Sequence, residues 1–318
     1  MKKVACVGIL VADVIVEKVT KYPDKGVLLP VNSITLHNGG NAMTASINMK
    51  KLGVDTYMVG KVGSDVFGDY LCNRLNEYGV NTSGLKRDKD VQTSASVLMI
   101  DESGERSFFH CVGTNAVFSV SDIDYSVIDN ADIVFVTGSF LMDRFDGEET
   151  AQFLKECKAR GKTTFLDVCW DAKGNWGKKL DMAMPYLDWL MPSIDEAVNI
   201  AEEQEPEKIA DVFMAKGVKN VVIKMGSKGA FVRCEGEKQG TMYPSFKGIN
   251  VVDTTGAGDS FCSGFIASFA RDKKIPECAV FANATGAHSV MAKGATTGIT
   301  SYDEIKKFAE ERKNACNS

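Results

Sequence analysis

The stretch Asp253-Thr254-Thr255-Gly256-Ala257-Gly258-Asp259-Ser260-Phe261 combines a tight turn, a helix start and a carboxylate. Two glycines flank an alanine at 256–258, so the backbone can turn sharply and expose its N–H groups. A helix-like run over 260–270 follows at once, and N–H groups at a helix N-terminus favour phosphate. The carboxylate of Asp259 falls in the first turn. An anion cradle beside a base indicates transfer of a phosphoryl group to a hydroxyl.

The turn also has a simpler interpretation. Glycine-rich turns between a strand and a helix are common in α/β proteins. An acidic residue in a first turn is favoured by the helix dipole alone. The short motif therefore leaves a structural and a catalytic role open.

Composition narrows the class of protein. The chain has 318 residues, enough for one large α/β domain with an insertion or for two domains. It carries 37 basic and 42 acidic residues and has no long basic run, so nucleic-acid binding is not expected. The nine cysteines are scattered without a C-x-x-C pair, which indicates a reducing compartment. No apolar run reaches the roughly 20 residues that span a bilayer. We therefore expect a cytoplasmic protein without a membrane partner.

Strand and helix patterns alternate along most of the chain. This order predicts a doubly wound, mostly parallel sheet with helices on both faces. The expected strands are 4–9, 56–59, 133–136, 164–168, 189–191 and 221–225. The expected helices are 41–52, 65–78, 148–160, 195–203, 207–216, 259–271, 276–292 and 302–314.

Three segments have the alternation of antiparallel ribbons. One lies over 13–36, the second flanks a turn at 101–104, and the third spans 230–246. The first two are expected to pair into one small sheet. We expect a main α/β domain over 1–10, 38–90 and 119–318, and a β lid over 11–37 and 91–118.

The long string at 253–261 resembles the C-terminal signature of the ribokinase-like family, the PfkB carbohydrate kinases. Gly39-Gly40-Asn41-Ala42 is similar to the family's other signature, a glycine pair that opens a helix. Further similarities are Gly8 with Asp13, Met191-Pro192-x-x-x-Glu196, Lys224-Met225-Gly226-x-x-Gly229, and Asn283-Ala284 ahead of Lys293-Gly294-Ala295.

The resemblance covers nearly the whole chain and implies both a fold and an activity. The fold is a Rossmann-like α/β/α sandwich with a small β-sheet lid. The activity is transfer of the γ-phosphoryl group of ATP to an alcohol, usually a hydroxymethyl group of a sugar or nucleoside. Asp259 matches the family's base, and Gly256, Ala257 and Gly258 match its anion hole. We expect the helix dipole to keep Asp259 ionised.

The same resemblance implies cofactor positions. Asp253 and Thr255 match ligands of a monovalent cation, K⁺, with further carbonyl ligands around Gly294; the alternative is that Asp253 only caps the turn. Glu196 matches the residue that orients Mg²⁺ through water, and Ser193 stands where the family has Asn. The positions expected to bind ATP are Ser193, Lys224, Gly226, Gly229 and Asn283.

Substrate positions follow in the same way. Asp13, Gly39, Gly40 and Asn41 match substrate-binding positions. Asp167 and Asp171 are further polar candidates. Val11 and Thr44 stand where family members carry Asn, which argues against a true ribokinase. On the second ribbon, Arg106, His110 and Asn115 are candidates for closing over the substrate.

The sequence thus predicts an ATP-dependent sugar kinase with a small-molecule substrate. Two alternatives stay open. A nucleoside kinase is one, since Val11, Phe108 and Phe109 suit a base. A non-catalytic sugar or nucleotide sensor on the same fold is the other. Lid-to-lid dimers occur in the family, so a homodimer through the lid is expected.

Overall fold

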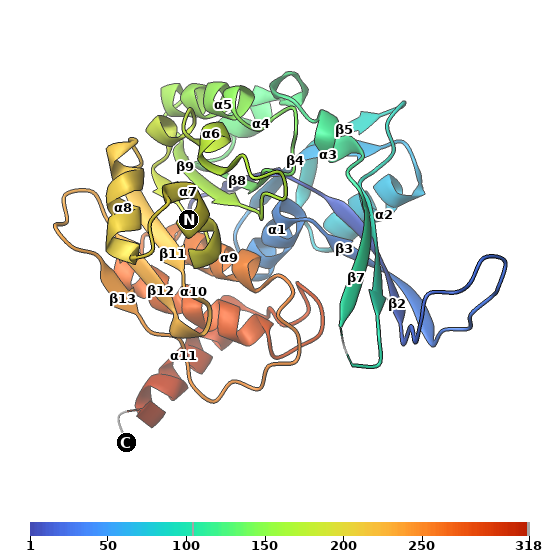
Figure 1. Cartoon of the computed structure of the whole chain (residues 1–318). Coiled ribbons are helices and arrows are strands. Elements are labelled where there is room, and N and C mark those ends of the chain that lie inside the picture. The colour runs from blue at the N-terminus through green and yellow to red at the C-terminus, as the bar shows by residue number, and fades with distance from the viewer. Residues whose placement is uncertain (104, 317–318) are drawn as a thin grey trace.

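The computed structural model describes residues 1–103 and 105–316 and contains a large sheet flanked by helices, with a smaller sheet at one side (Figure 1). Within the described residues the large sheet has the strand order β13-β12-β11-β10-β9-β8-β1-β4-β5. Its strands are β1 (Val4–Gly8), β4 (Thr56–Gly63), β5 (Asn81–Asp88), β8 (Ile133–Ser139), β9 (Thr163–Val168), β10 (Trp189–Leu190), β11 (Asn220–Lys224), β12 (Ala230–Arg233) and β13 (Thr241–Tyr243).

The large sheet is parallel from β5 to β11, and β12 and β13 are added antiparallel at one edge. Every residue of β1 is buried, as its unbroken apolar sequence requires when helices cover both faces. Val4 and Cys6 pack into one apolar cluster, whereas Ala5 and Val7 pack into the other. The strand period of two thus divides the core into two layers.

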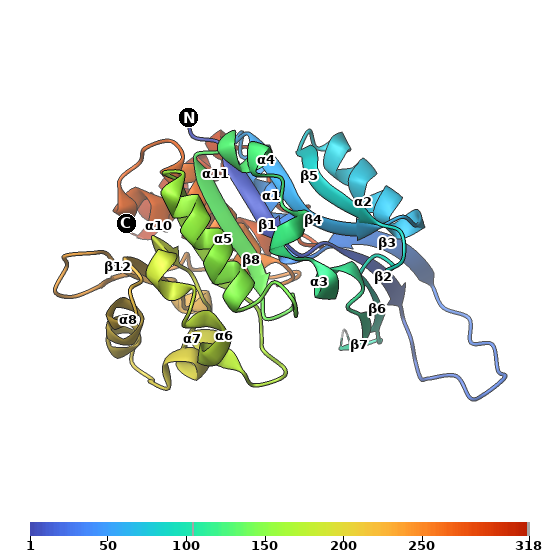
Figure 2. The same ribbon diagram turned by 90° about the horizontal axis from the view of Figure 1, so that it is seen from above.

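The helices form those two layers, seen from above in Figure 2. One layer contains α1 (Asn41–Lys51), α2 (Val66–Glu77), α9 (Ala257–Phe269), α10 (Ile275–Ser289) and α11 (Tyr302–Cys316). The other contains α4 (Tyr125–Asp129), α5 (Glu148–Ala159), α6 (Trp176–Leu180), α7 (Ile194–Ala201) and α8 (Pro206–Ala215). The short helix α3 (Thr114–Val117) follows the lid, and 3₁₀ turns lie at Val120–Asp122, Met184–Tyr186 and Gly226–Lys228. The expected α/β/α sandwich is confirmed.

The small sheet joins the two ribbons that lie far apart in the sequence. Its order is β3-β2-β6-β7, with β2 (Val11–Glu17), β3 (Ser33–Gly39), β6 (Ala95–Ile100) and β7 (Arg106–Cys111). β2 pairs with β6 in parallel, and each also pairs antiparallel with its hairpin partner. The ribbons therefore pair as expected into one lid sheet. Of the expected turn at 101–104, Gly104 lies outside the described residues.

The lid sheet has an inner and an outer face, set by the strand register. Asp13, Ser96 and His110 lie side by side in one row, and Ile15, Leu98 and Phe108 lie in another row of the same face. This face also bears Arg106, which contacts Asp253 in the main body, so it is the inner one. The outer face carries Leu36, Val97 and Phe109. Phe108 and Phe109, both named as residues that suit a base, therefore lie on opposite faces, because consecutive strand residues point to opposite sides of a sheet.

Candidate functional site

The turn before α9 takes the form that the signature predicts. Gly256 is the N-cap of α9 and has a left-handed backbone, with φ of 71°. A Cβ atom at this position would approach the Cβ of Ala295 to 2.6 Å, so both conformation and space require glycine. The first-turn N–H groups of a helix lack partners within it. The Ala257 N–H already donates to the Thr254 carbonyl at 3.2 Å, so the backbone at Gly258 is the part of this turn that offers a donor to an anion.

One side chain from another element bonds to Asp259, and a second side chain orients the first. Asn41 Nδ2 donates a hydrogen bond to Asp259 Oδ1 at 2.7 Å. The Cys169 thiol donates to Asn41 Oδ1 at 3.1 Å, which fixes the orientation of the amide. Asn41, expected to touch substrate, thus also contacts the predicted base.

The protonation of Asp259 differs from the expectation that the helix dipole keeps it ionised. Burial, and next the charge of Asp167, raise the pKa of Asp259 to about 7, although Lys224 and the Asn41 hydrogen bond oppose the shift. Some of the residue's surface remains open to solvent. A helix dipole contributes roughly 0.3–1 kcal/mol, whereas desolvation can shift a pKa by several units. Burial therefore prevails.

A buried ion pair lies beside the anion-binding turn. Lys224 Nζ donates to both carboxylate oxygens of Asp167, at 2.7 and 2.6 Å. Burial alone would lower the pKa of Lys224, but the charge of Asp167 outweighs it and raises that pKa. A Cβ atom on Gly258 would lie 3.5 Å from Lys224 Nζ, so a permanently charged ammonium borders the turn. The sequence presented Asp167 only as a polar candidate and gave no sign of its partner.

A cavity of about 350 Å³ opens from this turn. Its volume is that of a small-molecule site. Of the positions expected to bind ATP, Lys224, Gly226, Gly229 and Asn283 line it, and Ser193 does not. Asn283 also donates to the carbonyls of Tyr243 and Pro244, so it braces the wall. Sequence reasoning missed the apolar lining, which is Phe246, Ile249, Val251, Phe261, Ala287 and Val290.

Ser193 and Glu196 bond to each other at the start of α7. Glu196 Oε2 accepts from the Ser193 backbone N–H at 2.7 Å, and Ser193 Oγ accepts from the Glu196 N–H at 3.4 Å. This is a capping box. Ser193 also lies next to Lys224 through a parallel bridge. No group of three or more acidic, His or Cys side chains that could enclose a metal occurs among the described residues. A single carboxylate fits Mg²⁺, which usually keeps several waters and binds substrate phosphates.

On the inner face of the lid, Asp13 lies against the glycine pair. A Cβ atom on Gly39 would be 1.9 Å from Asp13 Oδ2, so glycine makes room for the carboxylate. Burial raises the pKa of Asp13 to about 6, against a hydrogen bond from Ser96. Ser96 Oγ lies 3.0 Å from His110 Nδ1, and burial lowers the pKa of His110. A carboxylate, a hydroxyl and an imidazole in one row suit a polyol.

Three further candidates have structural partners. Asn115 uses both amide atoms on the backbone of Leu10, at 3.3 and 3.0 Å. Asp171 Oδ2 accepts from the backbone N–H groups of Asn175 and Trp176. Gly40 is the N-cap of α1. Their substrate contacts stay predictions.

Asp253 anchors the start of the signature. Its Oδ1 accepts from the backbone N–H and the hydroxyl of Thr255, and its Oδ2 accepts from the Gly294 N–H at 2.9 Å. Arg106 Nη2 donates to Oδ1 at 2.8 Å. Burial alone would raise the pKa of Asp253, but the backbone hydrogen bonds, the Thr255 hydroxyl and Arg106 lower it to about 2. The structure thus brings the expected cation residues together, with an arginine among them.

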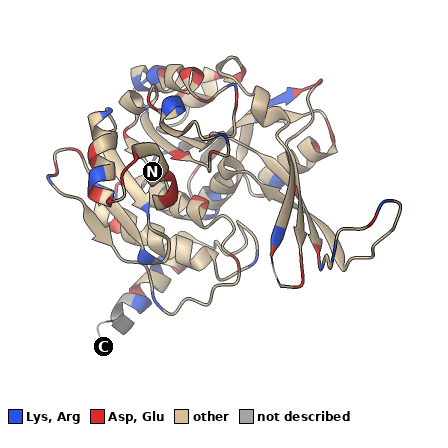
Figure 3. Ribbon diagram, in the orientation of Figure 1, with Lys and Arg blue, Asp and Glu red and all other residues tan. Residues whose placement is uncertain are grey.

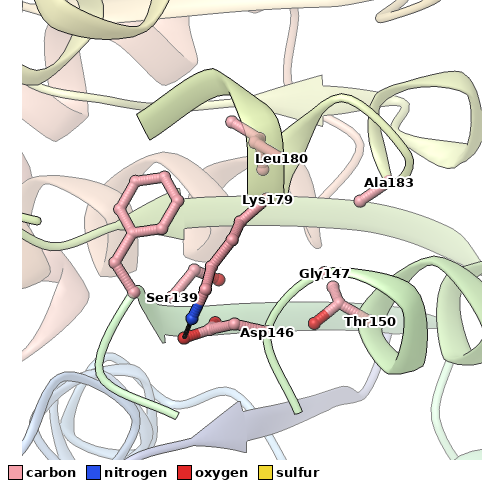
Figure 4. A pocket seen from close by; sticks show the side chains of 8 residues that line it. Ser139, Asp146, Gly147, Thr150, Lys179, Leu180 and Ala183 are labelled. Atoms are coloured by element: carbon pink, nitrogen blue, oxygen red, sulfur yellow. Dashed lines mark ion pairs between the residues drawn. The ribbon is translucent and has the colours of Figure 1, made fainter. Parts of the chain in front are cut away.

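A second, much smaller cavity is lined by residues of which none lines the first (Figure 4). Its volume is about 10 Å³, which suits one water molecule rather than a substrate. Asp146 and Lys179 point toward each other in it. We assign it no functional role.

The chain is similar to known proteins over most of its length. The model of the pfkB family of carbohydrate kinases matches residues 1–301. A ribokinase of Haemophilus influenzae is 25% identical over 97% of this chain and 99% of its own. An ATP-dependent 6-phosphofructokinase of Thermoanaerobacterium thermosaccharolyticum is 27% identical over 86% and 85%. The structure of Arabidopsis thaliana ribokinase with ribose and ATP has a TM-score of 0.84 at 25% identity, over 97% of this chain and 99% of that one. Within the described residues, none of the helices is long and apolar enough to cross a membrane.

Proposed function

The chain belongs to the pfkB family of carbohydrate kinases and is an ATP-dependent sugar kinase of that family, and we propose how its own residues act. Asp259 accepts the proton of the attacking hydroxyl. The backbone N–H groups over 256–258 stabilise the transferred phosphoryl group. Lys224 adds positive charge beside them. Asp13 binds other hydroxyl groups of the substrate under the lid.

One observation carries the proposal: a carboxylate with a pKa of about 7 lies in the first turn of a helix whose N-terminus is open to an anion. A general base works best when its pKa is near the working pH. In a loose transition state the proton moves late, so a base of this strength suffices. Lys224 keeps its charge, because the negative charge of Asp167 outweighs the effect of burial and raises the pKa of Lys224.

The cavity beside the turn supports the binding of ATP. Its apolar lining suits the base of a nucleotide, and its charged end at Lys224 suits the phosphates. Mg²⁺, when bound, would neutralise charge on the phosphates. Glu196 would hold it through water, with Ser193 orienting that carboxylate by the capping box.

The acceptor is proposed to be a sugar bound through its hydroxyls. The polar row of Asp13, Ser96 and His110 supports this class. A nucleoside is the second candidate, because the ring of Phe108 is 59% exposed on the same inner face and suits stacking on a base.

A coupled ADP-release assay over a panel of sugars and nucleosides tests the proposal. Turnover with a free sugar supports the first candidate, and turnover with nucleosides alone supports the second. Binding of panel compounds without any turnover would favour the sensor and refute the catalytic role of Asp259.

We also propose a homodimer through the outer face of the lid and a location in the cytoplasm. Leu36, Val97 and Phe109 form an apolar row there, and the Phe109 side chain is 63% exposed. Phe109→Asp should convert the dimer to a monomer in light scattering, whereas a wild-type monomer would refute the dimer.

The cytoplasmic location is supported by cysteines that are unpaired in the described part of the chain.

A further inference from the structure

The lid carries two charged residues at the edge that meets the main body. Glu17, Ile100 and Arg106 form one cross-strand row of the lid sheet. Arg106 binds Asp253, and Glu17 forms an ion pair with Lys293. The lid thus presents a positive and a negative side chain, and the main body presents a side chain of opposite charge to each of them. Basic and acidic residues are both scattered along the rest of the chain (Figure 3).

The main-body partners in the two ion pairs, Asp253 and Lys293, belong to two segments that are bonded to each other. Gly294, the residue after Lys293, donates its N–H to Asp253. Arg106 Nη1 also donates to the Thr255 hydroxyl at 2.7 Å. Thr255 directly precedes Gly256, the N-cap of the anion-binding helix. The guanidinium therefore holds the backbone immediately before the anion hole.

The resemblance to the family assigned Asp253 to a monovalent cation, but the carboxylate as it stands does not fit one. An ionised carboxylate offers about four lone-pair sites. Asp253 already accepts three hydrogen bonds at Oδ1, from the backbone and hydroxyl of Thr255 and from Arg106, and one at Oδ2 from Gly294. Its side chain is 11% exposed. A metal ion at Oδ1 would have to displace the guanidinium, and one at Oδ2 would be repelled by the guanidinium bound to the same carboxylate.

We propose that Arg106 is a positioning residue that replaces the monovalent cation: its guanidinium locks the closed lid onto Asp253 and Thr255 and thereby sets the anion hole. Lid closure and charge neutralisation at Asp253 are then one event. When the lid opens, Asp253 loses its cation and the turn before Gly256 loses a restraint. The anion hole is complete only when the substrate is enclosed, which protects ATP from hydrolysis. Only the activity measurements that test this role depend on the proposed function.

A first experiment needs no substrate. Melting temperatures of the wild type and Arg106→Ala are compared in potassium chloride and tetramethylammonium chloride at equal ionic strength. We expect the wild type to melt equally in both salts. Arg106→Ala should gain stability specifically in potassium, because the vacated carboxylate accepts the ion. Hydrogen exchange over 106–111 and 253–258 should rise in the variant. A wild type stabilised by potassium as much as the variant would overturn the proposal.

A second experiment uses turnover of a panel substrate. Arg106→Ala should lose roughly 10- to 100-fold in kcat, the loss expected for a charged hydrogen bond. Added guanidinium or potassium should restore part of it, which no general loss of structure predicts. Lys293→Met is the matched control, since it breaks the other lid contact and should show no ion-specific rescue. Turnover of Arg106→Ala within twofold of the wild type would refute the role. If no panel compound is turned over, the kinase proposal fails while the melting experiment still decides.

Discussion

The substitution Asp259→Asn should abolish most turnover and at the same time stabilise the protein. The amide keeps the shape of the carboxylate and can still accept the hydrogen bond from Asn41. It cannot take a proton from the acceptor hydroxyl, so kcat should fall by roughly 10²–10⁴. The stabilisation follows from the pKa of Asp259, which burial raises from 3.8 to about 7. An acid with a raised pKa holds a proton in the folded state that the unfolded chain has released.

The sign and size of the effect follow from proton linkage. Below a pH of about 4 both states are protonated, and the carboxyl costs nothing. Between about 4 and 7 folding takes up a proton, so stability falls as the pH rises, and above about 7 the whole cost is present. Three pKa units correspond to about 4 kcal/mol. This is an upper limit, because part of Asp259 is open to solvent. For a protein of 318 residues it amounts to about 6 °C in Tm at most.

Thermal melts without nucleotide at pH 5 and pH 8 measure the effect. The Asn variant should gain more stability over the wild type at pH 8 than at pH 5. In the wild type, kcat/KM should rise with pH through about 7. An Asn variant with near-normal turnover would disprove the base assignment. An equal or lower Tm at pH 8 would disprove the raised pKa.

Three further substitutions test the neighbours of Asp259. Asn41→Leu removes a hydrogen bond that lowers the pKa of the base, so the pH midpoint of kcat/KM should rise by up to about one unit; an unmoved midpoint contradicts this. Lys224→Met leaves Asp167 buried and unpaired and should cost roughly 3–5 kcal/mol in urea unfolding; adding Asp167→Asn should restore most of it, and a double variant as unstable as the single one argues against the pair. Gly39→Ala would press a Cβ atom onto Asp13, so KM for the acceptor should rise at least about tenfold while binding of a fluorescent ATP analogue stays unchanged; equal losses in both would refute the assignment.

The fold was predictable where its cause is local. A strand that is buried on both faces needs an apolar run such as Val4–Gly8, and a left-handed turn needs a glycine such as Gly256. Both are visible in the sequence. Strand alternation identified both ribbons of the lid. The strand β5 was missed, because Asn81–Asp88 is a largely polar edge strand with a single buried residue. Periodicity gives no signal where only part of a strand is covered.

The site was predictable in its positions but not in its contacts. The partners Asn41 and Asp259 are 218 residues apart, and Arg106 and Asp253 are 147 apart. No local pattern relates such residues, since only the topology brings the glycine-pair helix and the lid onto α9. The charge state of Asp259 was mispredicted for the same reason. The helix dipole is visible in the sequence, whereas the burial that overrides it depends on the whole layer.

The two carboxylates of the signature differ in chemistry because their surroundings differ. Asp253 accepts four hydrogen bonds and has a pKa of about 2, so it stays ionised at any working pH. Asp259 accepts one from Asn41, lies near the negative charge of Asp167, and has a pKa of about 7. When the environments of two acids give them very different pKa values, those values identify which acid exchanges protons. Asp259 is therefore the group that can serve as a base, while Asp253 is a fixed charge that can hold the lid. In the proposed mechanism the five residues between them connect closure of the lid to the chemistry, because Arg106 binds at one end and the acceptor hydroxyl would react at the other.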